Sequence, residues 1–227
     1  MTTLAGHREE PTGPRLARPE DKLRDEAISI GQSQPLPDRA KALIDFWFGP
    51  EGDPLRLKRR EIWFKSSEAF DRAVRAAFLE DHERAAAGVL DPSEASAEGA
   101  LARVLLLDQV PRNIFRGTPR AYASDEKARA TAARAIARGF DHEVPPAWRI
   151  FFYLPFVHSE EIADQRRALE FFAALPPDPD RSEPSRQVRR HYEIIARFGR
   201  FPHRNAILGR PSSAEEIAFL TEPDSSF

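Results

Sequence analysis

Hydrophobic residues recur at intervals of three and four positions over most of this chain, which is the spacing of one face of an α-helix. After Ser66 and Ser67, for example, Phe70, Val74 and Phe78 fall on one stripe. Alternating β-branched runs between turns, which are typical of strands, are nearly absent. The pattern predicts an all-α protein of about nine helices that pack as stacked antiparallel pairs.

Residues that start or stop helices set the expected boundaries. Ser124 and Ser159 are expected to cap helices, and Ser213 with Glu216 has the spacing of a capping box. Pro111 is expected to end its helix because proline has no N–H to donate. The expected helices cover residues 38–48, a short stretch after 54, 67–87, 93–110, 124–138, 145–152, 159–175, 184–199 and 213–220.

The first 36 residues differ from the rest of the chain. They are charged, contain several prolines and show no sustained apolar periodicity, so residues 1–36 are expected to form a flexible polar arm. Residues 37–227 have the length and the pattern of a single all-helical domain.

Composition excludes several classes of protein and site. Cysteine is absent, which excludes disulfides, thiolate metal ligands and a cysteine nucleophile. The formal net charge of −2 argues against a protein that coats nucleic acid or anionic lipid. No apolar run approaches the ~20 residues of a membrane helix, and no basic start leads into an apolar segment as in a secretory signal. We therefore expect a cytoplasmic protein without nucleic-acid or membrane partners, and the sequence leaves its oligomeric state open.

Polar residues on apolar helix faces indicate where a site lies. Asp108 continues the apolar face of its helix, and a helical wheel started at His158 puts Glu161 in the same inward wedge. His191 lies among apolar positions of the following helix. Buried carboxylates and imidazoles are costly without partners, so we expect these groups to converge, together with His203.

The segment at 197–210, RFGRFPHRNAILGR, combines four arginines with aromatic residues, a histidine and an asparagine. Aromatic side chains favour burial and buried arginines require partners, so this composition predicts a packed polar turn. Guanidinium groups match carboxylates and phosphates, and the turn before Pro202 would add free backbone N–H groups. Anion binding is therefore the favoured use of this segment.

Three chemistries are compatible with these residues. His158 and Glu161 stand one turn apart, as metal ligands often do, but the order is His-x-x-Glu and no second copy exists, so no metal is predicted. An imidazole oriented by a carboxylate is a candidate general base, and an arginine cluster is a candidate anion site. The alternative is a satisfied polar network, with Asp108 and Arg112 as its pair, that only fixes helix register. Phosphate-loop, dinucleotide and serine-hydrolase motifs are absent, so no cofactor is predicted.

Four blocks of the chain resemble a known family. They are LIDFWFG at 43–49, LLLDQVPRNIFRGTPRAYASD at 105–125, FYLPFVHSEEIADQ at 152–165 and RFGRFPHRNAILGR at 197–210. Together they are similar to the bacterial family called domain of unknown function 924, and the resemblance spans roughly residues 38–227. It implies an all-helical fold of tetratricopeptide-like stacked helix pairs, and it implies no established activity, cofactor or substrate. The positions that match the family's motif are Asp108, Gln109, Arg112, Asn113, Arg116, His158, Glu161, Gln165, Arg197, Gly199, Arg200, His203, Arg204, Asn205 and Arg210.

These observations predict a soluble helical protein with a polar pocket for a small anionic molecule, and hydrolytic or acid–base chemistry is its candidate activity. The candidate catalytic residues are His158, Glu161, His203 and Asp108. The candidate ligand-binding residues are Arg112, Asn113, Arg116, Gln165, His191, Arg200, Arg204 and Asn205. The alternative function is a non-catalytic helical scaffold that binds a peptide or protein, which predicts an exposed apolar groove between helix pairs.

Overall fold

The computed structural model describes residues 36–63, 67–89, 92–176 and 182–226, and this part of the chain contains nine α-helices and no strand. The all-α prediction is confirmed. The predicted arm at 1–36 lies outside the described residues except for its last position, where the first described helix begins. The helices are α2 (Leu36–Phe48), α3 (Glu68–Ala86), α4 (Ala97–Ile114), α5 (Asp125–Ala137), α6 (Phe140–Glu143), α7 (Pro146–Val157), α8 (Ile162–Ala173), α9 (Ser182–Phe198) and α10 (Ala214–Phe219).

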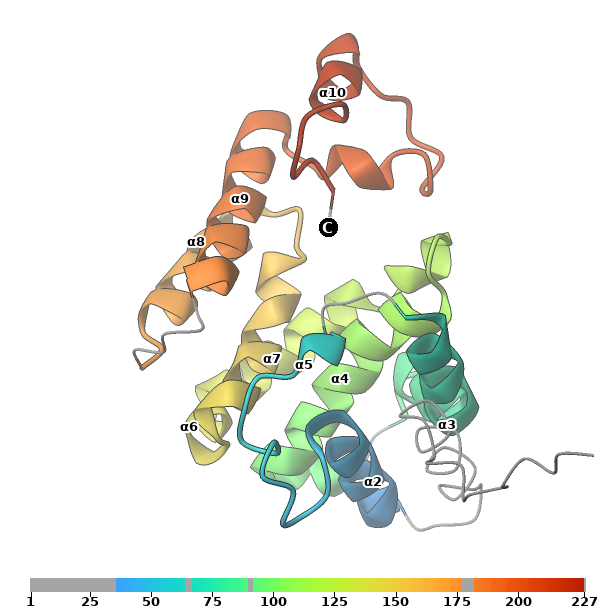
Figure 1. Cartoon of the computed structure of the whole chain (residues 1–227), viewed down its shortest axis with the longest axis vertical. Coiled ribbons are helices and arrows are strands. Elements are labelled where there is room, and N and C mark those ends of the chain that lie inside the picture. The colour runs from blue at the N-terminus through green and yellow to red at the C-terminus, as the bar shows by residue number, and fades with distance from the viewer. Residues whose placement is uncertain (1–35, 64–66, 90–91, 177–181, 227) are drawn as a thin grey trace, which may run out of the picture.

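Helix α4 lies at the centre of the molecule and packs against α2, α3, α5 and α7 (Figure 1). Helices α8 and α9 lie side by side next to α7, and the C-terminal segment with α10 follows at one end of the molecule (Figure 1). Several helices that are neighbours in sequence pack together, such as α3 with α4, α4 with α5 and α8 with α9, while α2 and α7 reach α4 from farther along the chain. None of the described helices is long and apolar enough to cross a lipid bilayer.

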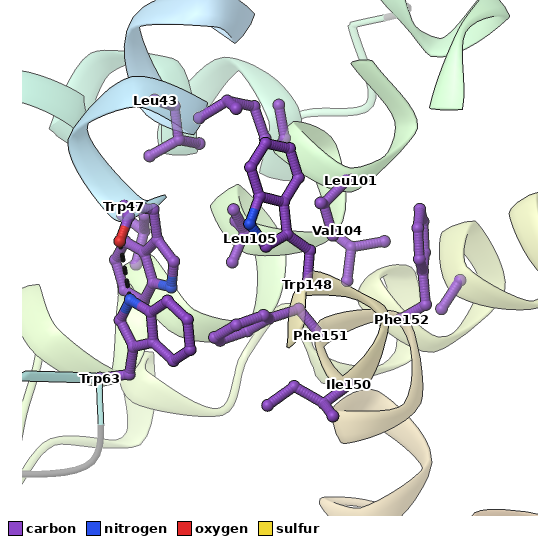
Figure 2. Packing of buried hydrophobic residues seen from close by; sticks show 14 of the residues in the cluster. Leu43, Trp47, Trp63, Leu101, Val104, Leu105, Trp148, Ile150, Phe151 and Phe152 are labelled. Atoms are coloured by element: carbon purple, nitrogen blue, oxygen red, sulfur yellow. Dashed lines mark hydrogen bonds between the residues drawn. The ribbon is translucent and has the colours of Figure 1, made fainter. Parts of the chain in front are cut away.

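An aromatic core holds the central helices together. Trp47, Phe48 and Trp148 are fully buried, and the rings of Phe48 and Trp148 stack with centroids 4.3 Å apart. Phe151 meets Trp63 edge to face at 5.1 Å. The indole N–H of Trp63 donates to the backbone carbonyl of Trp47 at 2.7 Å, which fixes the ring at the edge of the core (Figure 2). Aromatic pairs of this kind add about 0.5–1.5 kcal/mol beyond the area they bury.

A second, smaller apolar cluster joins the C-terminal segment to α9. It contains Ile194 and Ile195 of α9, Phe201 from the turn that follows, and Phe219 of α10. Helix α9 ends where Gly199 adopts a left-handed conformation with φ of 68°, which favours glycine. The cluster and this turn fold segment 197–210 back across the end of α9.

Two expected helix caps are confirmed at the level of individual atoms. The Ser67 side chain caps α3 by accepting from the Phe70 N–H, and Ser213 with Glu216 forms the predicted capping box of α10. Three other expectations are wrong in detail. Ser159 does not cap α8, which starts at Ile162 with Glu161 at its N-cap position. Helix α4 is capped by Ser96, after a short 3₁₀ turn at Pro92–Ala95, and residues 54–57 form turns in place of a helix.

Pro111 does not end its helix, contrary to the sequence-based expectation. Helix α4 continues to Ile114 with Pro111 inside it. Proline leaves the carbonyl four residues earlier without its helical donor, and that carbonyl belongs to Leu107. The hydroxyl of Ser124 donates to the Leu107 carbonyl at 2.6 Å and takes the place of the missing N–H. Ser124 precedes α5 but its side chain makes no capping bond there, because it serves α4 instead.

This replacement predicts a coupling between the two positions. Ser124→Ala should lower the free energy of unfolding by about 1–3 kcal/mol, since it leaves a buried carbonyl unsatisfied. In a Pro111→Ala background, residue 111 has an N–H that can donate to the Leu107 carbonyl. Ser124→Ala should therefore lower the free energy of unfolding by less in that background. Urea unfolding of the four proteins in the double-mutant cycle measures the difference. An equal cost in both backgrounds would contradict the assignment.

Candidate functional site

A cavity of about 760 Å³ lies where α4, α7, α9 and the C-terminal segment meet. Its size is within the range of small-molecule sites, about 300–1,000 Å³. One part of its wall is polar and formed by the last turns of α4, the end of α7, the middle of α9 and segment 203–207. Of the predicted site residues, it is lined by Arg112, Asn113, Arg116, His158, His191, His203 and Arg204. The structure therefore brings seven of the twelve predicted residues to one cavity wall, and Asp108 lies behind it in contact with His158.

His158 on the polar wall is paired with Asp108, which lies behind it and does not line the cavity. Asp108 in α4 has no solvent exposure, and its Oδ1 lies 2.8 Å from Nδ1 of His158, the residue at the C-terminal cap of α7. The second carboxylate oxygen of Asp108 accepts from the Gln109 side chain at 2.7 Å. Arg112 contacts the same carboxylate at 3.2 Å and donates to the Asp108 carbonyl at 2.7 Å. Both carboxylate oxygens are thus occupied, and the imidazole of His158 is held in one orientation.

Electrostatics fix the protonation of this pair. Burial acts to raise the pKa of Asp108, but the charge of Arg112, followed by His158, outweighs it and holds that pKa below its usual range. Burial, followed by Arg112, lowers the pKa of His158. An ionised carboxylate only accepts hydrogen bonds, so the neutral ring of His158 carries its proton on Nδ1. Nε2 of His158 then holds a lone pair and is the basic atom.

Two further histidines stand next to this pair. The His191 ring centroid lies 6.5 Å from that of His158, and Nδ1 of His191 donates to the Gln187 carbonyl at 2.8 Å. Burial lowers the pKa of His191 to about 3. Burial, followed by the charge of Arg204, lowers the pKa of His203 to about 4. At neutral pH the polar wall therefore carries neutral imidazoles.

Two arginines share one carboxylate at the side of the cavity. Arg112 forms a bidentate pair with Asp125 at 2.8 and 2.9 Å, whereas Arg204 reaches Asp125 only at 3.7 Å. The guanidinium of Arg204 lies between the rings of Tyr122 and Phe201, at 4.6 and 4.5 Å from their centroids. Burial, followed by Arg112, lowers the pKa of Arg204 to about 10, so it stays charged at neutral pH.

Glu161 is not part of the site, contrary to the helical-wheel prediction. The helix that carries His158 ends there, and α8 starts only at Ile162, so one wheel does not describe both residues. Glu161 is exposed to solvent. Its neighbour Glu160 turns inward instead, where it accepts from Arg210 at 2.7 and 2.9 Å and from the Phe201 N–H at 2.8 Å. The His-x-x-Glu pair considered as a metal site is therefore split.

Three other predicted ligand-binding residues lie outside the cavity wall and have structural partners. The Gln165 amide donates to the Val157 and Ser159 carbonyls at 2.7 and 2.6 Å, so it braces the turn that follows His158. Arg200 pairs with Glu216 at 2.6 Å. Asn205 is fully buried and accepts from Arg210 at 3.0 Å. Arg116 lines the cavity, but its partner is Asp71 at 2.8 Å and not Asp108.

Sequence reasoning missed several residues of the site. Asp125 was not among the candidates, although it carries the charge that both arginines share. Its signal is weak because an acidic residue in the first turn of a helix is ordinary. Tyr122 and Trp63 also line the cavity. Within the described ranges, no group of three or more histidine and acidic side chains has the arrangement of a metal site.

The match to known proteins agrees with this architecture. A family model for a bacterial protein of unknown function (DUF924) matches residues 43–224. The chain belongs to the DUF924 family. It is similar to a solved structure, the protein of unknown function ATU0120 from Agrobacterium tumefaciens, with 42% identity and a TM-score of 0.70 over 80% of this chain and 96% of that chain. No curated protein matches the chain.

The blocks that resemble the DUF924 family meet at the cavity. Blocks 105–125, 152–165 and 197–210 each supply part of the wall. Block 43–49 contains Trp47, whose carbonyl holds the indole of Trp63 against the same cavity. The DUF924 family and its solved relative are both described as having unknown function. The cavity is therefore the feature of this DUF924 protein that bears on its activity.

The buried histidines predict that this DUF924 protein loses stability in mild acid. The pKa values of His191 and His203 lie below the value of 6.5 that histidine has in an unfolded chain. Between pH 6.5 and about 4 the unfolded chain therefore binds more protons, and the free energy of unfolding falls as pH falls. The loss between pH 7.5 and 5 should be on the order of 2 kcal/mol per histidine.

Urea unfolding at both pH values measures this loss. His191→Gln should reduce the pH dependence by about one such contribution. His142→Gln is the matched control, because the His142 side chain is 72% exposed, and it should leave the pH dependence unchanged. A pH dependence that is the same in His191→Gln and in the unsubstituted protein would contradict the assignment.

Proposed function

We propose that this protein is an enzyme that binds a small anionic molecule in the cavity and uses His158 as a general base. The observation that carries the proposal is the hydrogen bond of 2.8 Å between Asp108 Oδ1 and His158 Nδ1 at the wall of that cavity. A buried carboxylate that orients an imidazole is a recurring arrangement of acid–base catalysis. Arg112 and Arg204 on the same wall supply the positive charge for the anion.

The chemistry follows from the protonation of the pair. With its proton on Nδ1, His158 accepts a proton at Nε2 from a water molecule or from the substrate. For a hydrolysis, the oxygen of that water forms a bond to the substrate carbonyl carbon. The bond between this carbon and the leaving group then breaks, and the imidazolium returns the proton to the leaving group. Asp108 stays ionised throughout and stabilises the imidazolium between the two steps, which is the function its low pKa supports.

A ligand cavity is better supported than the alternative of a peptide-binding scaffold. A scaffold requires a continuous exposed apolar surface. The exposed large hydrophobic residues in the described part of the chain are Leu55, Leu57, Val89 and Ile217, and they come from three separate segments. The polar groups that a scaffold would seal inside the protein instead line an open cavity. We therefore favour the small-molecule function.

The proposal predicts that turnover depends on both members of the pair. A panel of small carboxylate-bearing esters, amides and lactones, followed by NMR for product formation, provides the assay. His158→Gln should lower kcat by about 100-fold or more, since the proton acceptor is lost. Asp108→Asn should also lower kcat, because its amide can hold the wrong tautomer of His158.

His142→Gln, an exposed position outside the cavity wall, is the control for both variants. Circular dichroism and melting curves establish that each variant is folded at the assay temperature. Turnover that survives in folded His158→Gln would show that the base lies elsewhere.

A further inference from the structure

Arg204 differs from the other buried arginines of the site in how its donors are used. Only 6% of the residue is exposed, and its Nε has no hydrogen-bond partner among the described residues. Its nearest carboxylate contact, to Asp125, is 3.7 Å long. Arg112 by comparison holds the same carboxylate at 2.8 and 2.9 Å. Buried guanidinium groups normally satisfy their five N–H donors. Arg204 is therefore a charged group on the cavity wall whose hydrogen-bond donors are not all used.

Two aromatic rings hold this guanidinium in place. The Arg204 Cζ lies over the rings of Tyr122 and Phe201, 4.6 and 4.5 Å from their centroids, so packing against both rings restricts the guanidinium. A guanidinium group held in this way loses little side-chain rotamer freedom when a planar ligand group binds to it. A carboxylate is the planar anion that matches two parallel N–H donors.

The charges around the cavity limit the charge of the ligand. Arg112 and Arg204 are balanced by Asp108 and Asp125, and the histidines of the wall are neutral at neutral pH. Other charged groups nearby are paired, Arg210 with Glu160, Arg116 with Asp71 and Asp224 with Arg186, and Arg59 is a further arginine on the cavity wall. A carboxylate brings the single negative charge that one guanidinium can pair with, whereas a phosphate dianion brings a second charge that requires another cation.

Another part of the cavity wall is apolar, although Arg59, Gln187 and Asp224 also line the cavity. Trp63 lies on one side, and Ile150, Leu154 and Val157 of α7 follow one another along the wall. Phe172 of α8 completes this part of the lining. An inorganic ion would leave these side chains in contact with water, whereas an organic body would cover them. The apolar wall therefore calls for a ligand with an apolar part as well as a charge.

We infer that the cavity takes a monocarboxylate with an apolar body, its carboxylate on Arg204 and its body against the apolar wall. This rests on the proposed function and specifies its substrate class. Binding should raise the pKa values of the three histidines of the wall, because the added negative charge favours the imidazolium form. The charged and titratable groups that face the three histidines are Asp108, Arg112, Asp125, Glu160, Arg204 and Arg210.

Isothermal titration with matched ligands tests the inference. The probes are butyrate, octanoate and 3-phenylpropionate, the amide of each acid, inorganic phosphate and phenyl phosphate. We expect each larger acid to bind more tightly than butyrate, and each amide to bind about 30-fold more weakly than its acid.

Arg204→Gln should remove the preference for acid over amide, with a loss of about 30-fold for the acid and little change for the amide. Arg197→Gln is the matched control, since Arg197 is exposed, pairs with Glu215 and lies outside the cavity wall. If Arg204→Gln does not fold, Arg204→Lys replaces it, because lysine keeps the positive charge but lacks the two parallel N–H donors that match a carboxylate. The comparison of ligands on the unsubstituted protein needs neither variant.

Several outcomes would overturn the inference. Amides that bind as tightly as their acids would show that charge is not recognised, and tighter binding of phenyl phosphate would exclude a monoanion site. Absence of binding by every acid at millimolar concentration would exclude the class altogether. Acid binding without turnover that depends on His158 would leave the inference intact and remove the catalytic proposal. Turnover that depends on His158 but is equally fast for substrates with and without a carboxylate would overturn the inference and leave the catalytic proposal intact.

Discussion

The structure around the cavity depends on the burial of one carboxylate in the middle of the central helix. Asp108 has no contact with solvent, so its charge must be balanced within the protein. Arg112 supplies that balance from the next turn of α4, and His158 supplies it from the end of α7. Because these partners come from different helices, the need to compensate Asp108 also sets how α4 and α7 meet. Asp125 extends the same network to α5 and to Arg204 in the C-terminal segment.

The local departures from helical regularity bring functional groups to this network. Helix α4 passes through Pro111 because the Ser124 hydroxyl satisfies the Leu107 carbonyl, and its last turns therefore reach the cavity with Arg112, Asn113 and Arg116. Helix α7 ends at His158 and the chain turns before α8, which leaves the imidazole at a helix end where it faces the cavity. Gln165 braces that turn through three backbone carbonyls. A side chain at an element end held by such bonds combines access with fixed orientation.

Sequence reasoning recovered the site unevenly, and the reason differs between residues. His158, His191, His203 and Asp108 were found because a polar group on an apolar helix face requires a buried partner. Glu161 was placed wrongly because the wheel assumed one continuous helix where the chain has a break. Asp125 was overlooked because nothing in its own segment distinguishes it from an ordinary acidic residue near a helix N-terminus. Its role depends on Arg112 and Arg204, which reach it only after folding.

The sequence by itself determined the all-α class, most helix boundaries and the set of polar residues that had to find partners inside. Those properties follow from short-range effects, which are the helical period, capping side chains and the conformations of glycine and proline. Only the tertiary structure decided which partners meet, that Pro111 is accommodated, that Glu160 and not Glu161 turns inward, and that the polar wall encloses a cavity. These outcomes depend on contacts between residues far apart in the chain, whose distances are set by how whole helices pack and not by any local pattern.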